Sequence, residues 1–221
     1  MNEDNSNNNP EQNGGDAPQV IPDFMSEFAL YHFPNGNGYQ DFYTSQNQPF
    51  RDDHNALFCC LGDDYSHHVH QGPQTCGVQM ADRVRSALSG HLSDIADAAP
   101  NARNTDEEHI LQVISMRGDA IREADPNGME QMFETKMCGN ARLHAFMMSI
   151  DTDPMFGTGV DLELYCHLHD HIVEVWHGDM VLVYANGDTR SNFGQIPIRD
   201  VIIESNGNHG YRLLRHRRDR H

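Results

Sequence analysis

The feature that most constrains the fold is a change of hydrophobic period part-way along the chain. Apolar side chains recur at helical spacing in the first 150 residues, whereas later segments are short runs rich in Val, Ile, Tyr and Leu with turn residues between them. The helical segments are 55–61, 78–88, 105–121 and 141–150, and the strand-like runs are 172–176, 180–184, 198–203 and 211–214. Helices followed by strands predict an α+β domain in which helices pack around a small, mostly antiparallel sheet.

Local signals mark the ends of two of these helices. Gly62 is expected to end the short helix 55–61. Thr105 and Glu108 have the spacing of a capping box, and the turn sequence 125–128 follows, so a helix is predicted between them.

The ends of the chain differ in composition from its middle. Residues 1–22 include six Asn and several Gly and Pro, and they cannot bury enough apolar area to offset the entropy of ordering. Phe24, Phe28 and Tyr31 then follow at helical spacing and predict a short amphipathic helix before an extended arm. We therefore divide the chain into a disordered Asn-rich extension (1–22), an aromatic-rich arm (23–49), one folded domain (50–214) and a basic tail (215–221).

The charge and hydropathy of the chain argue against two classes of partner. Thirty-three Asp and Glu against 15 Lys and Arg give a formal net charge of −18, which repels phosphate backbones and anionic lipids. No stretch approaches the roughly 18 apolar residues of a membrane span, and residues 1–19 lack the apolar centre of a signal peptide. We expect neither nucleic acid nor a membrane as partner.

Cysteine and histidine usage predicts a reducing compartment and no metal or cofactor. The five cysteines are odd in number and lack the spacing of a disulfide scaffold. This composition favours a cytoplasmic location. If the chain is a secreted effector, the cytoplasm in question is that of a host cell. His167 and His171 would share a helix face if one helix covered both, yet no Cys-x-x-Cys motif or carboxylate completes a tetrahedral set.

Three short segments, far apart in the chain, form an ordered set of motifs. They are Asp53-His54-Asn55-Ala56-Leu57-Phe58, then Phe156-Gly157-Thr158-Gly159-Val160-Asp161-Leu162 with the strand 172–176, and finally 197–199 with Asn206-Gly207-Asn208-His209-Gly210-Tyr211. This set resembles the ovarian-tumour (OTU) family of papain-like cysteine proteases, which remove ubiquitin. The family motifs read Asp-Gly-x-Cys-(Leu or Phe)-Phe, Trp-Gly-x-x-x-Glu-Leu and Asn-His-Tyr. The resemblance covers residues 53–214 and implies an OTU-like, papain-type fold.

The resemblance also implies roles for individual residues. A thiolate at the start of the first motif's helix would be stabilised by the helix dipole and by an imidazolium. His209 would be that imidazole, oriented by Asn208 or Asn206, and Asp53 with nearby backbone N–H groups would help to form the oxyanion hole. Ubiquitin or a ubiquitin-like modifier is then the implied partner, and the acidic pairs 52–53 and 63–64 suit the basic surface that ubiquitin shows to such enzymes.

The position of the family's nucleophile holds Ala56, and a methyl group cannot attack a carbonyl. The chain is therefore expected to be inactive by this mechanism, either as a deliberately substituted substrate trap or as a natural pseudoenzyme. One alternative function is a non-catalytic module that binds ubiquitin or another protein. Another is a cysteine hydrolase that uses Cys59 or Cys60, which lie on roughly the same helix face but about 4.5–6 Å further along the axis. We favour core packing for both cysteines.

Overall fold

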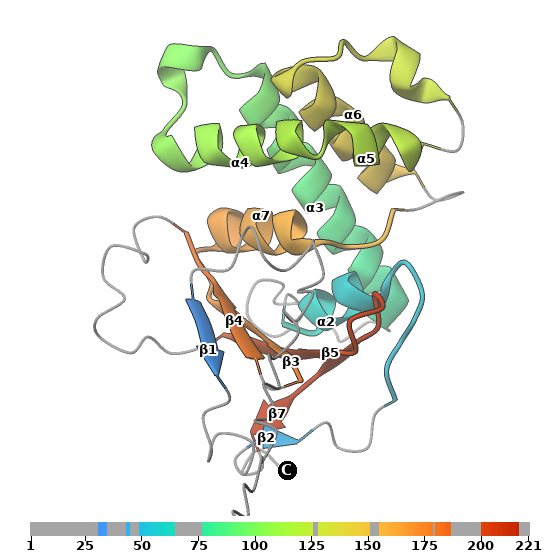
Figure 1. The fold of residues 1–221 in the computed structure, drawn as a ribbon, viewed down its shortest axis with the longest axis vertical. Helices are drawn as coiled ribbons and strands as arrows, with labels where there is room; N and C mark the ends of the chain where they lie inside the picture. The colour runs from blue at the N-terminus through green and yellow to red at the C-terminus, as the bar shows by residue number, and fades with distance from the viewer. Residues whose placement is uncertain are drawn as a thin grey trace, which may run out of the picture.

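The structure, a computed structural model, describes residues 31–34, 43–44, 49–64, 77–125, 128–150, 155–178, 180–186 and 200–216. In these segments, helices lie on one side of a small twisted sheet and several of them extend away from it (Figure 1). The predicted α+β class is confirmed. The predicted disordered extension lies outside the described residues, as do Phe24 and Phe28.

One long helix, α3, organises the helical part. The helices are α2 (Ala56–Asp64), α3 (Gly77–Asp97), α4 (Thr105–Met116), α5 (Gly118–Glu123), α6 (Met137–Ser149) and α7 (Gly159–His169), with 3₁₀ turns η2 (Pro100–Ala102) and η3 (Met129–Met132). α3 packs against α2, α6 and α7. Its buried residues recur every three or four positions, at Ala81, Val84, Leu88, Leu92 and Ile95. The stripe continues beyond residue 88, so α3 is longer than predicted.

Helix boundaries differ from the prediction at three places. Gly62 does not end the first helix but lies inside α2. A glycine is needed there because α3 packs closely, and a Cβ at position 62 would be 2.9 Å from the Cβ of Met80. The capping box of α4 begins one residue earlier than predicted, at Asn104. Asn104 Oδ1 accepts the backbone N–H of Glu107 at 2.9 Å, and the Glu107 carboxylate accepts the backbone N–H of Asn104 at 2.8 Å. The predicted helix 105–121 is two helices, separated at Arg117.

The main sheet has five strands in the order β1-β4-β3-β5-β6. They are β1 (Tyr31–Pro34), β3 (Val173–His177), β4 (Met180–Tyr184), β5 (Val201–Ser205) and β6 (Tyr211–Leu213). β3 and β5 are parallel, with Val173 beside Val201, and the other three neighbouring pairs are antiparallel. The prediction of a small, mostly antiparallel sheet is confirmed.

Parts of the aromatic-rich arm and of the basic tail belong to sheets. β1 pairs with β4, so that Tyr31 lies beside Val183. β2 (Tyr43–Thr44) and β7 (Arg215–His216) form a separate two-stranded sheet. Tyr31 therefore lies in a strand and not in the predicted amphipathic helix, because the edge of β4 offers its backbone a partner. The pairings also carry the fold beyond the predicted limits 50–214 at both ends.

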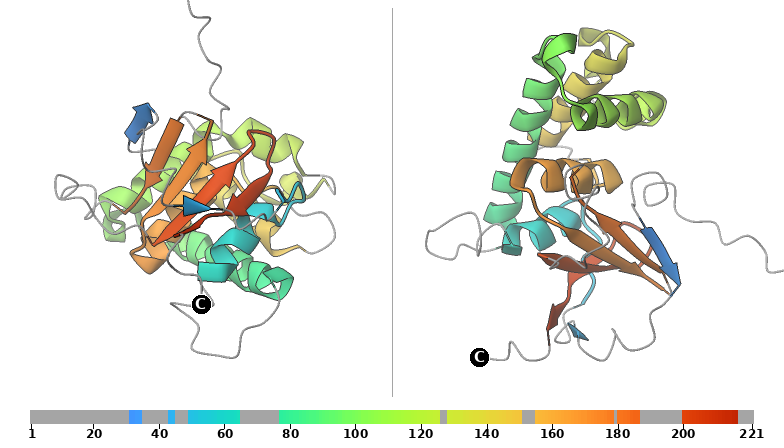
Figure 2. Two further views of the ribbon diagram at one scale, coloured as in Figure 1. Left: turned by 90° about the horizontal axis from the view of Figure 1, so that it is seen from below. Right: turned by 90° about the vertical axis from the view of Figure 1, so that its left-hand side faces the viewer.

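α7 lies at the centre of the molecule, between the sheet and α4 (Figures 1 and 2). Residues 159–166 are buried, and Leu162 belongs to the same core cluster as Val175 of β3. A helix buried all round usually lacks charged groups, yet Asp161 and Glu163 are buried here. None of the described helices is both long enough and apolar enough to cross a bilayer.

Candidate functional site

The loop that carries His209 is joined to the segment just before α2. Arg51 and Tyr211 exchange two backbone hydrogen bonds, of 3.1 and 3.0 Å. Beside them, Asn206 Nδ2 donates to Asp52 Oδ1 at 3.1 Å. The first and third motifs, 154 positions apart at this contact, are therefore neighbours in space.

Asn206 organises the His209 loop through its side chain. Its Oδ1 accepts the backbone N–H groups of Asn208 at 2.9 Å and of Gly210 at 3.0 Å. His209 has φ 60°, a left-handed conformation that side chains rarely adopt. Gly210 has no room for a Cβ, which would collide with Asn206 and Asp52. The loop is thus held in one shape, and the residue that holds it is Asn206.

Asn208, the other candidate for orienting His209, is exposed, and its backbone N–H makes the bond to Asn206. The sequence left both asparagines open for this role. The contacts favour Asn206, which supports the backbone of the loop through two hydrogen bonds.

α2 begins at the nucleophile position, Ala56, whose side chain belongs to the core and is 1% exposed. The turn before it is shaped by Asp53, which accepts the N–H of Asn55 at 3.0 Å and a guanidinium N–H of Arg51 at 2.8 Å. The hydrogen bond to Asp53 raises the pKa of Arg51. Asp53 therefore fixes the turn that presents the positive end of α2, which is an indirect contribution to any oxyanion site.

The middle motif contacts both of the others. The rings of Phe156 and His209 are stacked, with centroids 4.7 Å apart. Next to Phe156, Gly157 lies against Leu57 of α2, so closely that a Cβ at 157 would be 2.7 Å from Leu57 Cδ2. The three motifs that are separate in sequence are thus brought together around the start of α2.

Replacing Gly157 by alanine should destabilise the fold by about 1–3 kcal/mol, because Leu57 is fully packed and cannot yield. Chemical denaturation would measure the change. Gly90→Ala is a matched control, since Gly90 is exposed on α3 with nothing within 4 Å of its added Cβ. There alanine should stabilise the helix by about 0.5–1 kcal/mol. Equal effects of the two substitutions would contradict the close contact.

Sequence reasoning missed two buried residues that support this region. Arg85 of α3 donates to Asn55 Oδ1 and to the carbonyl of Met148, both at 3.0 Å. His144 of α6 lies 2.9 Å from Asp161, with Nε2 facing the carboxylate. Both residues lie within segments whose spacing predicted helices. The signal in the sequence was a charged or polar residue among apolar neighbours. Such a residue suggests a buried hydrogen bond but does not indicate which residue accepts or donates it.

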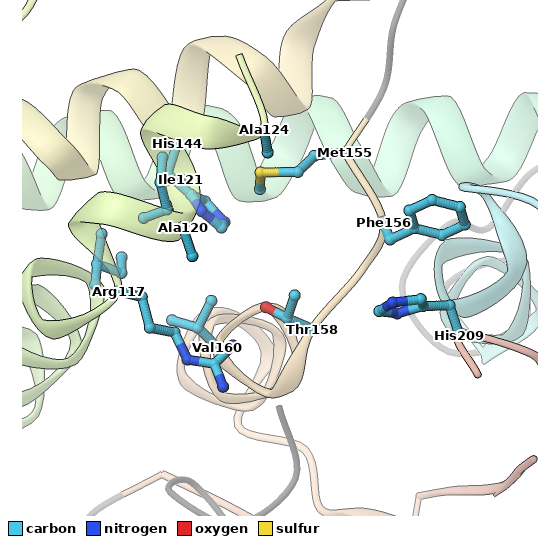
Figure 3. Close-up of a pocket in the computed structure, with 11 residues that line it drawn as sticks. Arg117, Ala120, Ile121, Ala124, His144, Met155, Phe156, Thr158, Val160 and His209 are labelled. Atoms are coloured by element: carbon cyan, nitrogen blue, oxygen red, sulfur yellow. The ribbon is translucent and has the colours of Figure 1, made fainter. Parts of the chain in front are cut away.

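Beside His209 is a cavity of about 500 Å³ (Figure 3). α5 forms one wall, the segment 155–158 and the start of α7 form another, and His144 reaches it from α6. In Figure 3 the Phe156 ring lies above the His209 ring, and both are on the opposite side of the cavity from Arg117. The candidate site therefore comprises the start of α2, the His209 loop and this adjoining cavity.

The two cysteines proposed as substitute nucleophiles line a different, smaller cavity of about 150 Å³ together with Arg51 and Tyr211. Cys60 is buried, and burial raises the pKa of its thiol well above the ordinary value, so it is not a thiolate near neutral pH. Cys59 is half-buried and packs against the core. These positions agree with the core-packing interpretation of both residues.

The histidines considered for a metal are not brought together. α7 ends at His169, so His171 lies beyond the helix, whereas His167 pairs with His91 of α3 at 2.8 Å between ring nitrogens. One helix would have to cover both His167 and His171 for them to share an ion, and α7 does not reach His171. Within the described segments, no three His, Cys, Asp or Glu side chains are placed to hold one ion.

Comparison with known proteins finds likeness in structure but none in sequence. No family model matches the chain, and no curated protein matches it in sequence. Among solved structures, the viral OTU domain protease from Farallon virus is similar, with a TM-score of 0.49 and 11% sequence identity over 87% of this chain and 92% of that one. We base the functional proposal on the contacts of this chain and not on that likeness.

Proposed function

We propose that the chain is an OTU-like, papain-type domain that recognises ubiquitin or a ubiquitin-like modifier, and that Ala56 leaves it without isopeptidase activity. The observation that carries the proposal is the link between the two distant motifs. The Asn206–Asp52 hydrogen bond and the Arg51–Tyr211 pairing hold the His209 loop beside the turn that starts α2. A papain-type site needs this juxtaposition of an imidazole and a helix amino end.

The chemistry of an Ala56→Cys variant follows from this arrangement. The introduced thiol would lie at the amino end of α2, where the helix dipole favours the thiolate. His209 would take the thiol proton, the sulfur would attack the isopeptide carbonyl, and the imidazolium would return the proton to the leaving lysine amine. Backbone N–H groups of the turn that Asp53 shapes would stabilise the oxyanion. With alanine at position 56 the recognition surface would persist without this reaction.

The charge beside the site suits the proposed partner. Asp52 and Asp53 are exposed next to the His209 loop, and an acidic rim attracts a basic protein surface. The described cysteines form no disulfide, which is compatible with the proposed cytoplasmic location. The proposal includes no metal, cofactor, nucleic acid or membrane.

Ubiquitin carrying a C-terminal vinyl electrophile tests the proposal. The unmodified chain should not be labelled, whereas Ala56→Cys should form a one-to-one adduct, because only the variant places a thiol beside His209. Mass spectrometry of the adduct would locate the modified residue. Ala102→Cys is a matched control, since Ala102 is an exposed alanine on η2, and it should remain unlabelled.

Each other outcome has a definite meaning. Labelling of the unmodified chain that is lost in Cys59→Ser or Cys60→Ser would show a substitute nucleophile. If neither form is labelled while the unmodified chain still binds ubiquitin, the chain is a binding module. Absence of both labelling and binding would contradict the proposal altogether.

A further inference from the structure

The cavity beside α5 has a lining that differs from the rest of the chain. Seven of its eleven lining residues are apolar, among them Ile121, Met155 and Phe156. The other four are Arg117, His144, Thr158 and His209, so no lining residue in the described part of the chain carries a carboxylate. The lining formed by the described residues thus has one fixed positive charge and no negative one, in a chain of formal net charge −18. Its volume of about 500 Å³ suits a small molecule.

His144 lines this cavity and has one nitrogen without a hydrogen-bond partner among the described residues. Its side chain is 2% exposed, and its Nε2 lies 2.9 Å from Asp161 Oδ1. Asp161 Oδ2 accepts the N–H and the hydroxyl of Thr158, at 2.6 and 3.0 Å. A carboxylate with such donors only accepts, so Nε2 of His144 carries the proton. Its Nδ1 is buried and has no hydrogen-bond partner within the described residues, a condition that a bound group would relieve.

Arg117 adds a fixed positive charge to the same cavity. It stands at the break between α4 and α5, and its guanidinium lies beside Val160 in Figure 3. The apolar residues of α5 and of the segment 155–156 lie around these polar groups. One cavity thus combines an apolar wall, a cation and an imidazole nitrogen that can accept a proton.

We propose that this cavity binds a small monocarboxylic acid with an aromatic or alkyl body. The acid would transfer its proton to His144 Nδ1, which leaves an imidazolium between two carboxylates, those of Asp161 and of the ligand. Arg117 would share the ligand's charge, and the body would lie against Met155 and Phe156. The carboxylate could belong to a free organic acid or to the C-terminus of a peptide with an apolar last residue. The cavity adjoins the proposed isopeptidase site and shares His209 and Phe156 with it. Binding of the acid needs no nucleophile, so its test does not depend on isopeptidase activity.

Titration calorimetry with 3-phenylpropanoate and its neutral analogue 3-phenylpropanamide tests the site in the full chain. The acid should bind about tenfold or more tightly than the amide, because only the acid can make charge-assisted bonds. Arg117→Gln should remove most of that difference. Ala124→Phe, at an exposed position of the cavity rim, should abolish binding by filling the space, while Ala102→Phe, on the exposed turn η2, should leave it unchanged.

A second pair of ligands separates the two sources of the carboxylate. Acetyl-Leu-Phe with a free carboxyl group should bind more tightly than 3-phenylpropanoate if the natural ligand is a chain terminus, and less tightly if it is a free acid. The amidated dipeptide serves as its neutral control. Equal affinities of acid and amide, no binding of any carboxylate at millimolar concentration, or full binding by Ala124→Phe would each overturn the proposal.

Discussion

In an Ala56→Cys variant that releases ubiquitin from an isopeptide-linked substrate, the additional substitution His209→Ala should lower kcat/KM about 10²–10⁴-fold. The expected loss is large because the imidazole would act twice, first as the base for the thiol and then as the acid for the leaving amine. The His209 loop has a fixed place beside α2, through Asn206 and Asp52. A different residue is therefore not expected to take over this role.

Cleavage of a fluorogenic ubiquitin amide, followed over several enzyme concentrations, would measure this effect. His91→Ala in the same background is a suitable control, since His91 of α3 pairs with His167 of α7 and has no part in the proposed mechanism. That control should retain the activity of Ala56→Cys. Unchanged turnover after loss of His209 would remove this residue from the mechanism, and no turnover by Ala56→Cys itself would contradict the proposed chemistry.

Asp161→Ala should have the largest effect on stability and should lower the free energy of unfolding by about 3–5 kcal/mol. The Asp161 side chain is completely buried and accepts hydrogen bonds from His144 and from both donors of Thr158. Its removal leaves these donors buried without an acceptor, and it also removes the capping interaction at the start of α7. α7 lies in the centre of the core, so the loss cannot be relieved by fraying.

Urea denaturation monitored by circular dichroism would determine this change. Asp82→Ala, at an exposed position of α3, is the matched control and should change the unfolding free energy by less than about 0.5 kcal/mol. Asp161→Asn should fall between the two, because the amide keeps one acceptor oxygen but brings N–H donors toward Thr158. If Asp161→Ala and Asp82→Ala had equal effects, the buried network would have no role in stability.

The sequence predicts the strands well because turn residues bound them. Gly178, at the end of the predicted 172–176 run, has φ 55°, and β3 and β4 form an antiparallel pair on either side of it. The helix α3 is predicted too short because polar residues beyond position 88 interrupt the pattern, although Leu92 and Ile95 continue the buried stripe. Periodicity thus locates an element more reliably than it locates its ends.

The strand at Tyr31 could not be predicted in the same way. The spacing of Phe24, Phe28 and Tyr31 suits a helix, but Tyr31 pairs with Val183 about 150 positions later, and a local pattern contains no information on such a partner. A tertiary contact outweighs the local preference here.

The candidate site could be predicted only in part. Motif order is enough to propose that the start of α2 and His209 meet. Arg85 escaped assignment, and the sequence could not choose between Asn206 and Asn208, because these roles depend on backbone groups that come within reach only in the folded chain. The pairing of His144 with Asp161 is similar, since helical spacing predicts that each is part of a helix but not that α6 and α7 face each other there.

The bond between Asp52 and Asn206 has a consequence for biosynthesis. The two residues are 154 positions apart, which corresponds to roughly 8–30 s of translation at about 5–20 residues per second. During that interval the start of α2 has been synthesised, but the His209 loop that later lies beside it has not. A nascent or prematurely terminated chain would therefore expose the start of α2 to chaperones, and only a chain translated through β6 could assemble the candidate site.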